Sequence, residues 1–441
     1  MANSYLTRTY QSGGNRKKWT MSMWVKRSAL GSTNILFQTY VSTYTFCPFD
    51  TNNRLQFQDG NGGEYVTTMK FMDTNAWYHI VVAIDTDLAT ANDRYKFYVN
   101  GERITAFDTS TPPSQGYEGE WNKAQLHNIG RHHSAGNYHN GLMSHIHFCD
   151  GYQYQASDFG ETDSVTGEWK IKTAPSVSYG TTGFFTLKDG NSVTDQSPNS
   201  NDWTANGTLT KTEDCPSNVF ATFNAEANNC NAVLSNGNTT VSHSSTSWKR
   251  ALSNLGHTSG KWYWEVKRNN SNTPFYKFGM VEDFGQTANM PSHEHHADNQ
   301  YGWAWYVNGG NIELRTSQAV ISGYSQSDLG NTNLGNGDIL CIALDLDNGR
   351  LHARKNDGSW LKSGDPANNT GGYAIANWSA GKLYIPACSV YQNATCEHNF
   401  GNGYFGTTAV SSAGTNASNI GIFEYDVPTG FTAWSTKGLN E

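Results

Sequence analysis

Apolar and polar residues alternate with a period of two over many short stretches of the chain, which is the pattern of β-strands. In residues 18–26 every second side chain from Trp19 to Val25 is apolar, and Trp24 lies on the opposite face. This stretch predicts a strand that is covered on both sides. Residues 77–84 form a nearly continuous apolar run and predict a buried strand.

Turn residues separate these stretches at short intervals. Residues 94–104 predict a strand, an Asn100-Gly101 turn and a returning strand, because Asn-Gly is a strong hairpin signal. Strand-length runs resume in the second half at 261–266, 276–281, 301–306, 338–344, 350–355 and 383–390. Strands this closely spaced predict a second antiparallel sandwich.

A polar region rich in Asn, Ser, Thr, Asp and Gly, at about 190–247, divides the two halves. We expect a first sandwich with its connector in residues 1–214, a linker in 215–224 and a second sandwich in 225–441. The fold class is therefore predicted to be all-β, with two antiparallel sandwiches in tandem.

The two halves share a weak internal repeat. An apolar strand that ends at Asp85 is followed by a strand over 94–100, and an apolar strand that ends at Asp345 is followed by one over 350–356. Both second strands begin with Arg and end at a turn Asn. The pattern indicates one supersecondary unit used twice, although any two β-meanders share some of these features.

Composition narrows the function classes. Of 441 residues only 15% are charged, 13% are aromatic and 44 are glycine, with a net charge of −8. So few charges disfavour a coiled coil or a charged disordered tail, and the acidic balance disfavours nucleic-acid binding. Most aromatic residues are expected in the two cores, for example Trp19, Trp262 and Trp303.

The chain has no run of 18 apolar residues, and its first residues lack the apolar stretch of a signal peptide, so we expect folding in a cytoplasm. Its seven cysteines include no Cys-x-x-Cys pair. We therefore expect buried thiols in place of a disulfide framework or a zinc knuckle.

Motifs in each half resemble a known family. The first half resembles the laminin-G-like or concanavalin-A-like jelly roll, through residues 19–25, 77–81, 97–101, 128–131 and 141–148. The second half resembles a SPRY domain, through residues 260–266, 278–281, 301–304, 336–345 and 383–387. One departure is the segment 400–416, which is longer and richer in Gly and Ser than the usual end of a SPRY domain. It is expected to be a packing surface or a mobile loop.

The arrangement as a whole resembles virion-associated proteins of tailed phages, especially marine ones, through residues 5–9, 14–20, 179–184, 195–203, 216–224 and 425–431. The resemblance implies a non-enzymatic surface protein of the virion, as a tail fibre, spike or capsid appendage, that is assembled in the host cytoplasm. It implies adhesion to host-surface glycans or proteins. Implied partners are other virion proteins and further copies of this chain, without nucleic acid or membrane insertion.

Two other functions stay open. One is a purely structural role as a cement or adaptor protein within the virion. The other is cleavage of glycans, which needs two carboxylates on one concave face. The suitably spaced pairs, Asp85 with Asp87 and Asp345 with Asp347, lie where strands enter turns, and there Asp is expected for backbone hydrogen bonds. We therefore expect no enzymatic activity.

No metal site is assigned from the sequence. His145 and His147 share a strand face, but alternate polar positions are usual on an outward face. Laminin-G-like domains often carry calcium at a loop rim, so the resemblance leaves calcium as the one cofactor to consider.

Loop aromatics and histidines are the remaining candidates for ligand binding. Sugars stack their C–H faces on Trp or Tyr, while neighbouring polar side chains bind the hydroxyl groups. The candidates are Tyr40, Tyr44, Tyr117, Trp121, His132, His133 and Tyr138 in the first domain, and His293, His295, His296, Tyr324, Trp360 and Trp378 in the second.

Overall fold

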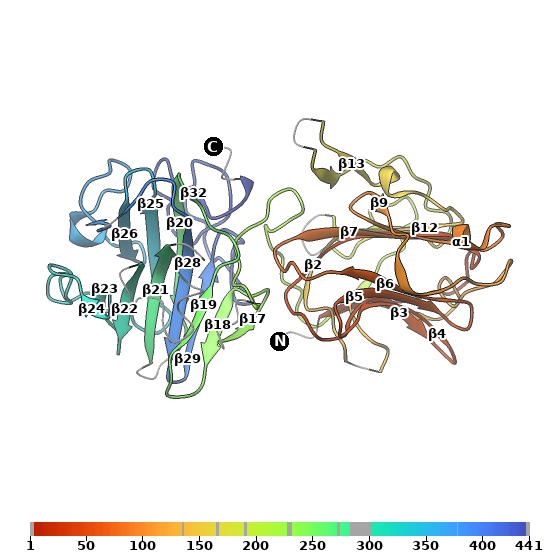
Figure 1. Cartoon of the computed structure of the whole chain (residues 1–441), viewed down its shortest axis with the longest axis horizontal. Coiled ribbons are helices and arrows are strands. Elements are labelled where there is room, and N and C mark those ends of the chain that lie inside the picture. Colours follow the sequence, from red (N-terminus) through yellow and green to blue (C-terminus); the bar gives the residue numbers. More distant parts are fainter. Residues whose placement is uncertain are drawn as a thin grey trace. The chain divides into compact units, whose positions relative to one another are not determined.

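The computed structural model describes residues 4–134, 136–164, 167–188, 192–226, 232–270, 274–282, 301–376 and 378–437. The chain divides into two compact units, residues 1–211 with 215–217 and residues 212–214 with 218–441. Each unit is an antiparallel jelly-roll sandwich with little helix, so the predicted all-β fold class is confirmed (Figure 1).

In the first unit an eight-stranded sheet packs on a six-stranded sheet. The eight-stranded sheet has the order β10 (Phe107–Thr111), β6 (Glu64–Lys70), β5 (Arg54–Asp59), β4 (Tyr44–Phe49), β3 (Asn34–Tyr40), β11 (Leu126–Ile129), β1 (Tyr5–Thr9) and β16 (Thr204–Asn206). The six-stranded sheet has the order β15 (Phe184–Thr186), β12 (Gly141–Asp150), β2 (Lys18–Arg27), β7 (Trp77–Asp85), β8 (Tyr95–Val99) and β9 (Glu102–Arg103). Three short elements complete this part of the chain: the helix α1 (Ala91–Arg94), the 3₁₀ turn η1 (Ala156–Asp158) and the hairpin of β13 (Gly160–Thr162) and β14 (Trp169–Ile171).

The six-stranded sheet of the first unit is buried on both faces. On its inner face, Trp19 packs against Phe37 and Phe148. On its outer face, Trp24 stacks on His79 with ring centroids 4.8 Å apart, and Trp169 Nε1 donates to His79 Nδ1 at 3.0 Å. The prediction that the first long strand is covered on both sides is thus confirmed. The covering side chains come from within residues 151–164 and 167–179.

The second unit repeats the two-layer plan. Its larger sheet has the order β17 (Val233–Ser235), β18 (Thr240–His243), β29 (Ala394–Asn399), β20 (Lys261–Arg268), β25 (Ile339–Asp345), β26 (Arg350–Lys355) and β27 (Tyr373–Ala374), and β32 (Thr432–Ala433) pairs with β20. The other sheet has the order β19 (Lys249–Leu252), β28 (Tyr384–Tyr391), β21 (Phe275–Glu282), β22 (Gly302–Asn308), β23 (Asn311–Thr316) and β24 (Ala319–Val320). The 3₁₀ turn η2 (Leu361–Ser363) and the pair β30 (Tyr404–Phe405) and β31 (Thr408–Ala409) complete it.

The core of the second unit contains Trp262 and Trp303, as expected. The outer face of its larger sheet is also covered, because Phe405 and Phe423 pack there against Tyr263. The segment 400–416 therefore contributes a packing surface. Residues from the expected linker pack here as well, since Phe220 lies in the same outer cluster.

The repeat seen in the sequence is a repeat in the structure. Lys18 pairs with Asp85 across β2 and β7, and Lys261 pairs with Asp345 across β20 and β25. The Lys Nζ lies 2.7 Å from a carboxylate oxygen in the first pair and 3.3 Å in the second. Each unit therefore builds three central strands on the same plan.

The turn that closes the repeat is also the same in both units. Asn100 and Asn356 have positive φ angles of 47° and 49°. The Asn100 Oδ1 accepts the backbone N–H of His79 at 2.8 Å, and the Asn356 Oδ1 accepts that of Ile339 at 2.8 Å. Asparagine suits both positions because it tolerates this conformation and supplies the acceptor.

Among the described residues, no helix is long and apolar enough to span a membrane.

Candidate functional site

The outer face of the eight-stranded sheet in the first unit carries a row of polar side chains. Inward-pointing residues such as Phe37 and Phe57 belong to the core, so their neighbours along each strand point outward. The outward residues stand in register across five strands, because Glu64 pairs with Gln58, Gln58 with Phe46, Phe46 with Gln38, and Gln38 with Asn128. We call this face the amide face; it consists of Gln38, Tyr40, Tyr44, Phe46, Gln56, Gln58, Glu64 and Asn128. Gln38 and Asn128 are covered, each with only 1% of its surface exposed.

Side chains of the amide face hold one another in fixed positions. Gln56 Nε2 donates to Glu64 Oε1 at 2.8 Å, and the Tyr44 hydroxyl donates to Gln58 Oε1 at 3.3 Å. The Tyr44 and Phe46 rings meet edge to face with centroids 5.2 Å apart. The face therefore presents ordered amides beside aromatic rings.

A loop that contains His132 and His133 lies against one end of this face. We call residues 131–134 and 136–139 the histidine loop. Gln38 Nε2 donates to His133 Nδ1 at 3.1 Å, and the His133 backbone N–H donates to Gln38 Oε1 at 3.0 Å. The Tyr40 ring, 39% exposed, stacks on the His133 ring at a centroid distance of 3.9 Å. Strand β3 thus supplies both the anchor of the loop and its stacking partner.

Arg131 extends this cluster to Tyr5 and Tyr138. Its guanidinium donates to the carbonyl oxygens of His132 and His133 at 2.9 and 3.0 Å, and its Cζ lies 4.2 Å from the centre of the Tyr5 ring. The Tyr5 and Tyr138 ring centroids are 5.9 Å apart. The structure therefore brings together four of the predicted residues, Tyr40, His132, His133 and Tyr138, through Arg131.

His132 and His133 favour the neutral form. Burial and the neighbouring Arg131 lower the pKa of His133, and burial, His133 and Arg131 lower the pKa of His132. Because His133 Nδ1 accepts a hydrogen bond, its proton is placed on Nε2, where it is a donor. A sugar ring can stack on Tyr40 while this imidazole and the partly exposed Gln58 amide bind its hydroxyl groups.

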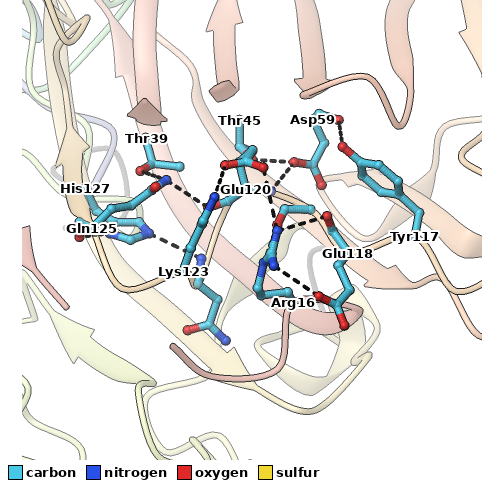
Figure 2. A network of polar contacts seen from close by, with 12 residues as sticks. Arg16, Thr39, Thr45, Asp59, Tyr117, Glu118, Glu120, Lys123, Gln125 and His127 are labelled. Atoms are coloured by element: carbon cyan, nitrogen blue, oxygen red, sulfur yellow. Dashed lines mark hydrogen bonds and ion pairs between the residues drawn. The ribbon is translucent and has the colours of Figure 1, made fainter. Parts of the chain in front are cut away.

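Tyr117 and Trp121 do not join this cluster. Trp121 is 0% exposed and packs against Trp19 and Phe37 in the core, so its ring is closed to a ligand and the prediction of a binding role for it is corrected. The Tyr117 hydroxyl donates to the backbone oxygen of Asp59 at 3.0 Å (Figure 2). Tyr117 thereby ties its loop to the end of β5.

A second polar network of this unit includes the buried carboxylate of Asp59 (Figure 2). Asp59 accepts hydrogen bonds from the Thr45 hydroxyl, the Glu120 backbone N–H at 2.9 Å and the Tyr95 hydroxyl at 3.0 Å. Burial raises the pKa of Asp59, although these three donors oppose the shift. Gly119 makes the close approach possible, because a Cβ there would lie 2.0 Å from Asp59 Oδ2.

The second carboxylate of the network is also engaged. Glu120 lies 3.6 Å from the Arg16 guanidinium and 3.2 Å from Lys123 Nζ. Arg16 also donates to the Gly119 carbonyl oxygen at 2.7 Å (Figure 2). These contacts fasten the 116–125 loop to the sandwich, and they leave both carboxylates paired with protein donors.

In the two acidic pairs noted in the sequence, the first carboxylate accepts hydrogen bonds from backbone N–H groups and lies beside a lysine. Asp85 accepts the N–H of Asp87 at 3.2 Å in addition to its lysine. Asp345 accepts the N–H groups of Asp347 at 3.0 Å and Asn348 at 2.9 Å. Both pairs therefore serve tight turns.

The predicted residues of the second unit are partly buried. The Tyr324 hydroxyl donates to the Gly372 carbonyl oxygen, and Lys362 Nζ lies 5.4 Å from the centre of the Tyr324 ring. The Arg354 Cζ lies 5.0 Å from the centre of the Trp360 ring, and Trp378 packs against the core. His293, His295 and His296 lie outside the described residues.

Sequence reasoning missed the amides of the candidate site. Gln56 and Gln58 alternate with the apolar Leu55 and Phe57, and this alternation was the available signal. No such pattern marks the contact between Arg131 and Tyr5, because these two residues are far apart in the sequence.

Comparison with known protein families gives a match in the first unit. Residues 2–157 match the family model described as the concanavalin A-like lectin/glucanases superfamily. A search of curated proteins finds no match. Similar solved structures include the SPRY domain of human HERC1, at 16% identity over 40% of this chain and 96% of that chain with a TM-score of 0.27. The PSpry domain of TRIM65 is similar at 16% identity over 41% of this chain and 91% of that chain, with a TM-score of 0.28.

Proposed function

We propose that this chain is a non-enzymatic surface protein of a phage particle and that it binds host-surface glycans through the amide face and the histidine loop. The observation that carries the proposal is the stack of the exposed Tyr40 on His133, beside in-register glutamines. Leu126, 43% exposed, follows on the neighbouring strand β11 and adds apolar surface.

The chemistry of this surface suits sugars. A pyranose ring has an apolar C–H face, which packs on an aromatic ring, and hydroxyl groups that both donate and accept hydrogen bonds. Amides such as Gln58 also donate and accept, so they match hydroxyl groups without a formal charge. A single open face of this kind binds weakly, and linked copies on a particle raise the avidity by roughly 10²–10⁴.

The placement on a phage particle is supported by the motifs that join and flank the two domains, such as residues 195–203 and 216–224. In this setting the partners are host-surface glycans, other virion proteins and further copies of the chain. The absence of catalysis is supported by Asp59, Glu120, Asp85 and Asp345, whose carboxylates are already paired with protein donors. Hydrolysis needs one carboxyl group free to donate a proton and a second carboxylate near the scissile bond.

The proposal is tested with the purified full chain, displayed in many copies on beads, against an array of bacterial surface polysaccharides. We expect binding that Tyr40→Ala weakens and that Tyr152→Ala leaves unchanged, because Tyr152 is a 41% exposed tyrosine outside the amide face. Binding that is insensitive to Tyr40→Ala would refute the proposed site. Release of reducing sugar from a bound polysaccharide would establish the enzyme, and a particle structure with the amide face buried against another virion protein would establish the cement role.

A further inference from the structure

Two cysteines and a histidine meet inside the second sandwich. Cys388 lies on β28, and Cys396 and His398 lie two residues apart on β29, in the facing sheet. All three are buried. Alternation along β29 directs Cys396 and His398 to the same side, toward Cys388. The residues therefore converge from two different sheets.

The distances between their donor atoms are short. The two Sγ atoms are 3.4 Å apart, and Cys396 Sγ lies 3.6 Å from His398 Nε2. One donor atom from each of the three residues lies within 4.8 Å of the others. Among the described residues this is the one group of three such donors that is close enough to share a metal ion.

We propose that Cys388, Cys396 and His398 form a binding site for a soft divalent cation, of which Zn²⁺ is the biological example. In a tetrahedral zinc site, Zn–S bonds of about 2.3 Å and Zn–N bonds of about 2.0 Å separate two sulfurs by about 3.8 Å and a sulfur from a nitrogen by about 3.5 Å. The observed separations of 3.4 and 3.6 Å are close to these values.

The surroundings favour a divalent ion. The histidine ring is enclosed by Phe223, Phe278 and Phe400, so a net charge here would be costly. Two thiolates neutralise a divalent cation, and the two thiol protons leave to solvent when the ion binds. The Val241 carbonyl oxygen lies 3.7 Å from Cys396 Sγ and offers a fourth donor.

A disulfide between the same cysteines fits the geometry less well. A disulfide needs the sulfurs about 2.05 Å apart, whereas the observed separation is 3.4 Å, and it leaves His398 without a role. The His398 Nδ1 atom is buried and has no hydrogen-bond partner. A ring that serves as a ligand through Nε2 accounts for an imidazole kept in this apolar place.

The test is a metal titration of the full chain. The protein is unfolded in denaturant with reductant and a chelator, freed of both small molecules, and refolded with Cd²⁺, whose thiolate complexes absorb in the ultraviolet. We expect one Cd²⁺ per chain, a thiolate-to-metal absorption band and a higher melting temperature than in the metal-free protein. Zn²⁺ is expected to displace Cd²⁺ and abolish the band.

Variants locate the ion. Cys388→Ser and His398→Ala should each lower the affinity by more than the roughly 10–100-fold that loss of an outer-shell partner costs. Cys341→Ser is the matched control, since Cys341 is a buried thiol of the same unit outside the group, and it should bind one ion as the wild type does. No band in the wild-type chain, or a Cys388–Cys396 disulfide in protein purified without reductant, would overturn the proposal. The wild-type titration decides the matter even where a variant fails to fold.

Discussion

Gln38 and His133 hold each other through two hydrogen bonds, from Gln38 Nε2 to His133 Nδ1 and from the His133 backbone N–H to Gln38 Oε1. The residues are 95 positions apart in the sequence, so the pair fixes the histidine loop to strand β3. Because the loop is held before a ligand arrives, binding does not have to order it.

Replacing Gln38 by Ala should free the histidine loop and weaken glycan binding. The variant removes the partner of His133 Nδ1 and of its backbone N–H, and a lost buried hydrogen bond costs about 1–3 kcal/mol. We expect faster amide hydrogen exchange in residues 131–134 and 136–139, together with about tenfold weaker binding.

Gln58→Ala is the control for this experiment. Gln58 lies on the same face but contacts Tyr44, so its loss should weaken binding without changing exchange in the histidine loop. Unchanged loop exchange in Gln38→Ala would show that the two hydrogen bonds do not hold the loop.

Removing calcium should leave glycan binding unchanged. Amide and aromatic side chains make up the amide face, and its one carboxylate, that of Glu64, already accepts from Gln56. Calcium sites need six to eight oxygen ligands, commonly with several carboxylates. Binding measured with a chelator of divalent cations and with added Ca²⁺ should agree within error. Loss of binding on chelation would place a calcium ion at the site.

The local alternation of apolar and polar residues predicted the strands. It did not predict which loop residues are buried by contacts with distant parts of the chain. The stretch from Trp19 to Val25 alternates, and it forms a strand covered on both faces as expected. Trp121 resembled a loop aromatic in sequence, but the network around Asp59 carries its loop inward and buries the ring. Phe220 looked like part of a linker because polar residues surround it, yet it packs over the larger sheet of the second unit. Such contacts depend on the partner surface, which local periodicity does not encode.

The matching turns at Asn100 and Asn356 should respond alike to substitution. At each position, replacement by Ala removes the side-chain acceptor, and the left-handed conformation costs the Ala residue about 1–2 kcal/mol. Gly loses only the acceptor, since it adopts a positive φ freely. We expect Ala to lower the free energy of unfolding by about 1 kcal/mol more than Gly at both sites, measured by denaturant unfolding.

Asn52→Ala supplies the control for these turn variants. Asn52 is exposed and is not among the residues with positive φ, so its replacement should change stability by less than about 0.5 kcal/mol. Equal stability of the Ala and Gly variants would contradict the assigned role of the turn conformation.

Glu265 should make the second unit less stable as the pH rises toward neutrality. Its carboxylate is 0% exposed and accepts from the Tyr263 hydroxyl at 3.0 Å and the Tyr425 backbone N–H at 2.9 Å, among other donors. Burial raises the pKa of Glu265 from 4.5 to about 7, although these hydrogen bonds oppose the shift. Between these two values the folded state keeps a proton that the unfolded state has released, so stability falls as the pH rises through this window and levels off above it.

The substitution Glu265→Gln isolates this effect because it removes the titrating group. Buried histidines such as His257, whose pKa is lowered to about 3 by burial, act in the opposite direction below pH 6.5, so the comparison is between variant and wild type. Relative to the wild type, the variant should lose the decline between pH 4.5 and 7, which is worth roughly 3 kcal/mol. Denaturant unfolding of both chains at several pH values measures this, with the exposed Glu161→Gln as a control that leaves the profile unchanged. Parallel profiles for Glu265→Gln and the wild type would show that the Glu265 carboxyl has similar proton affinity in the folded and unfolded chains.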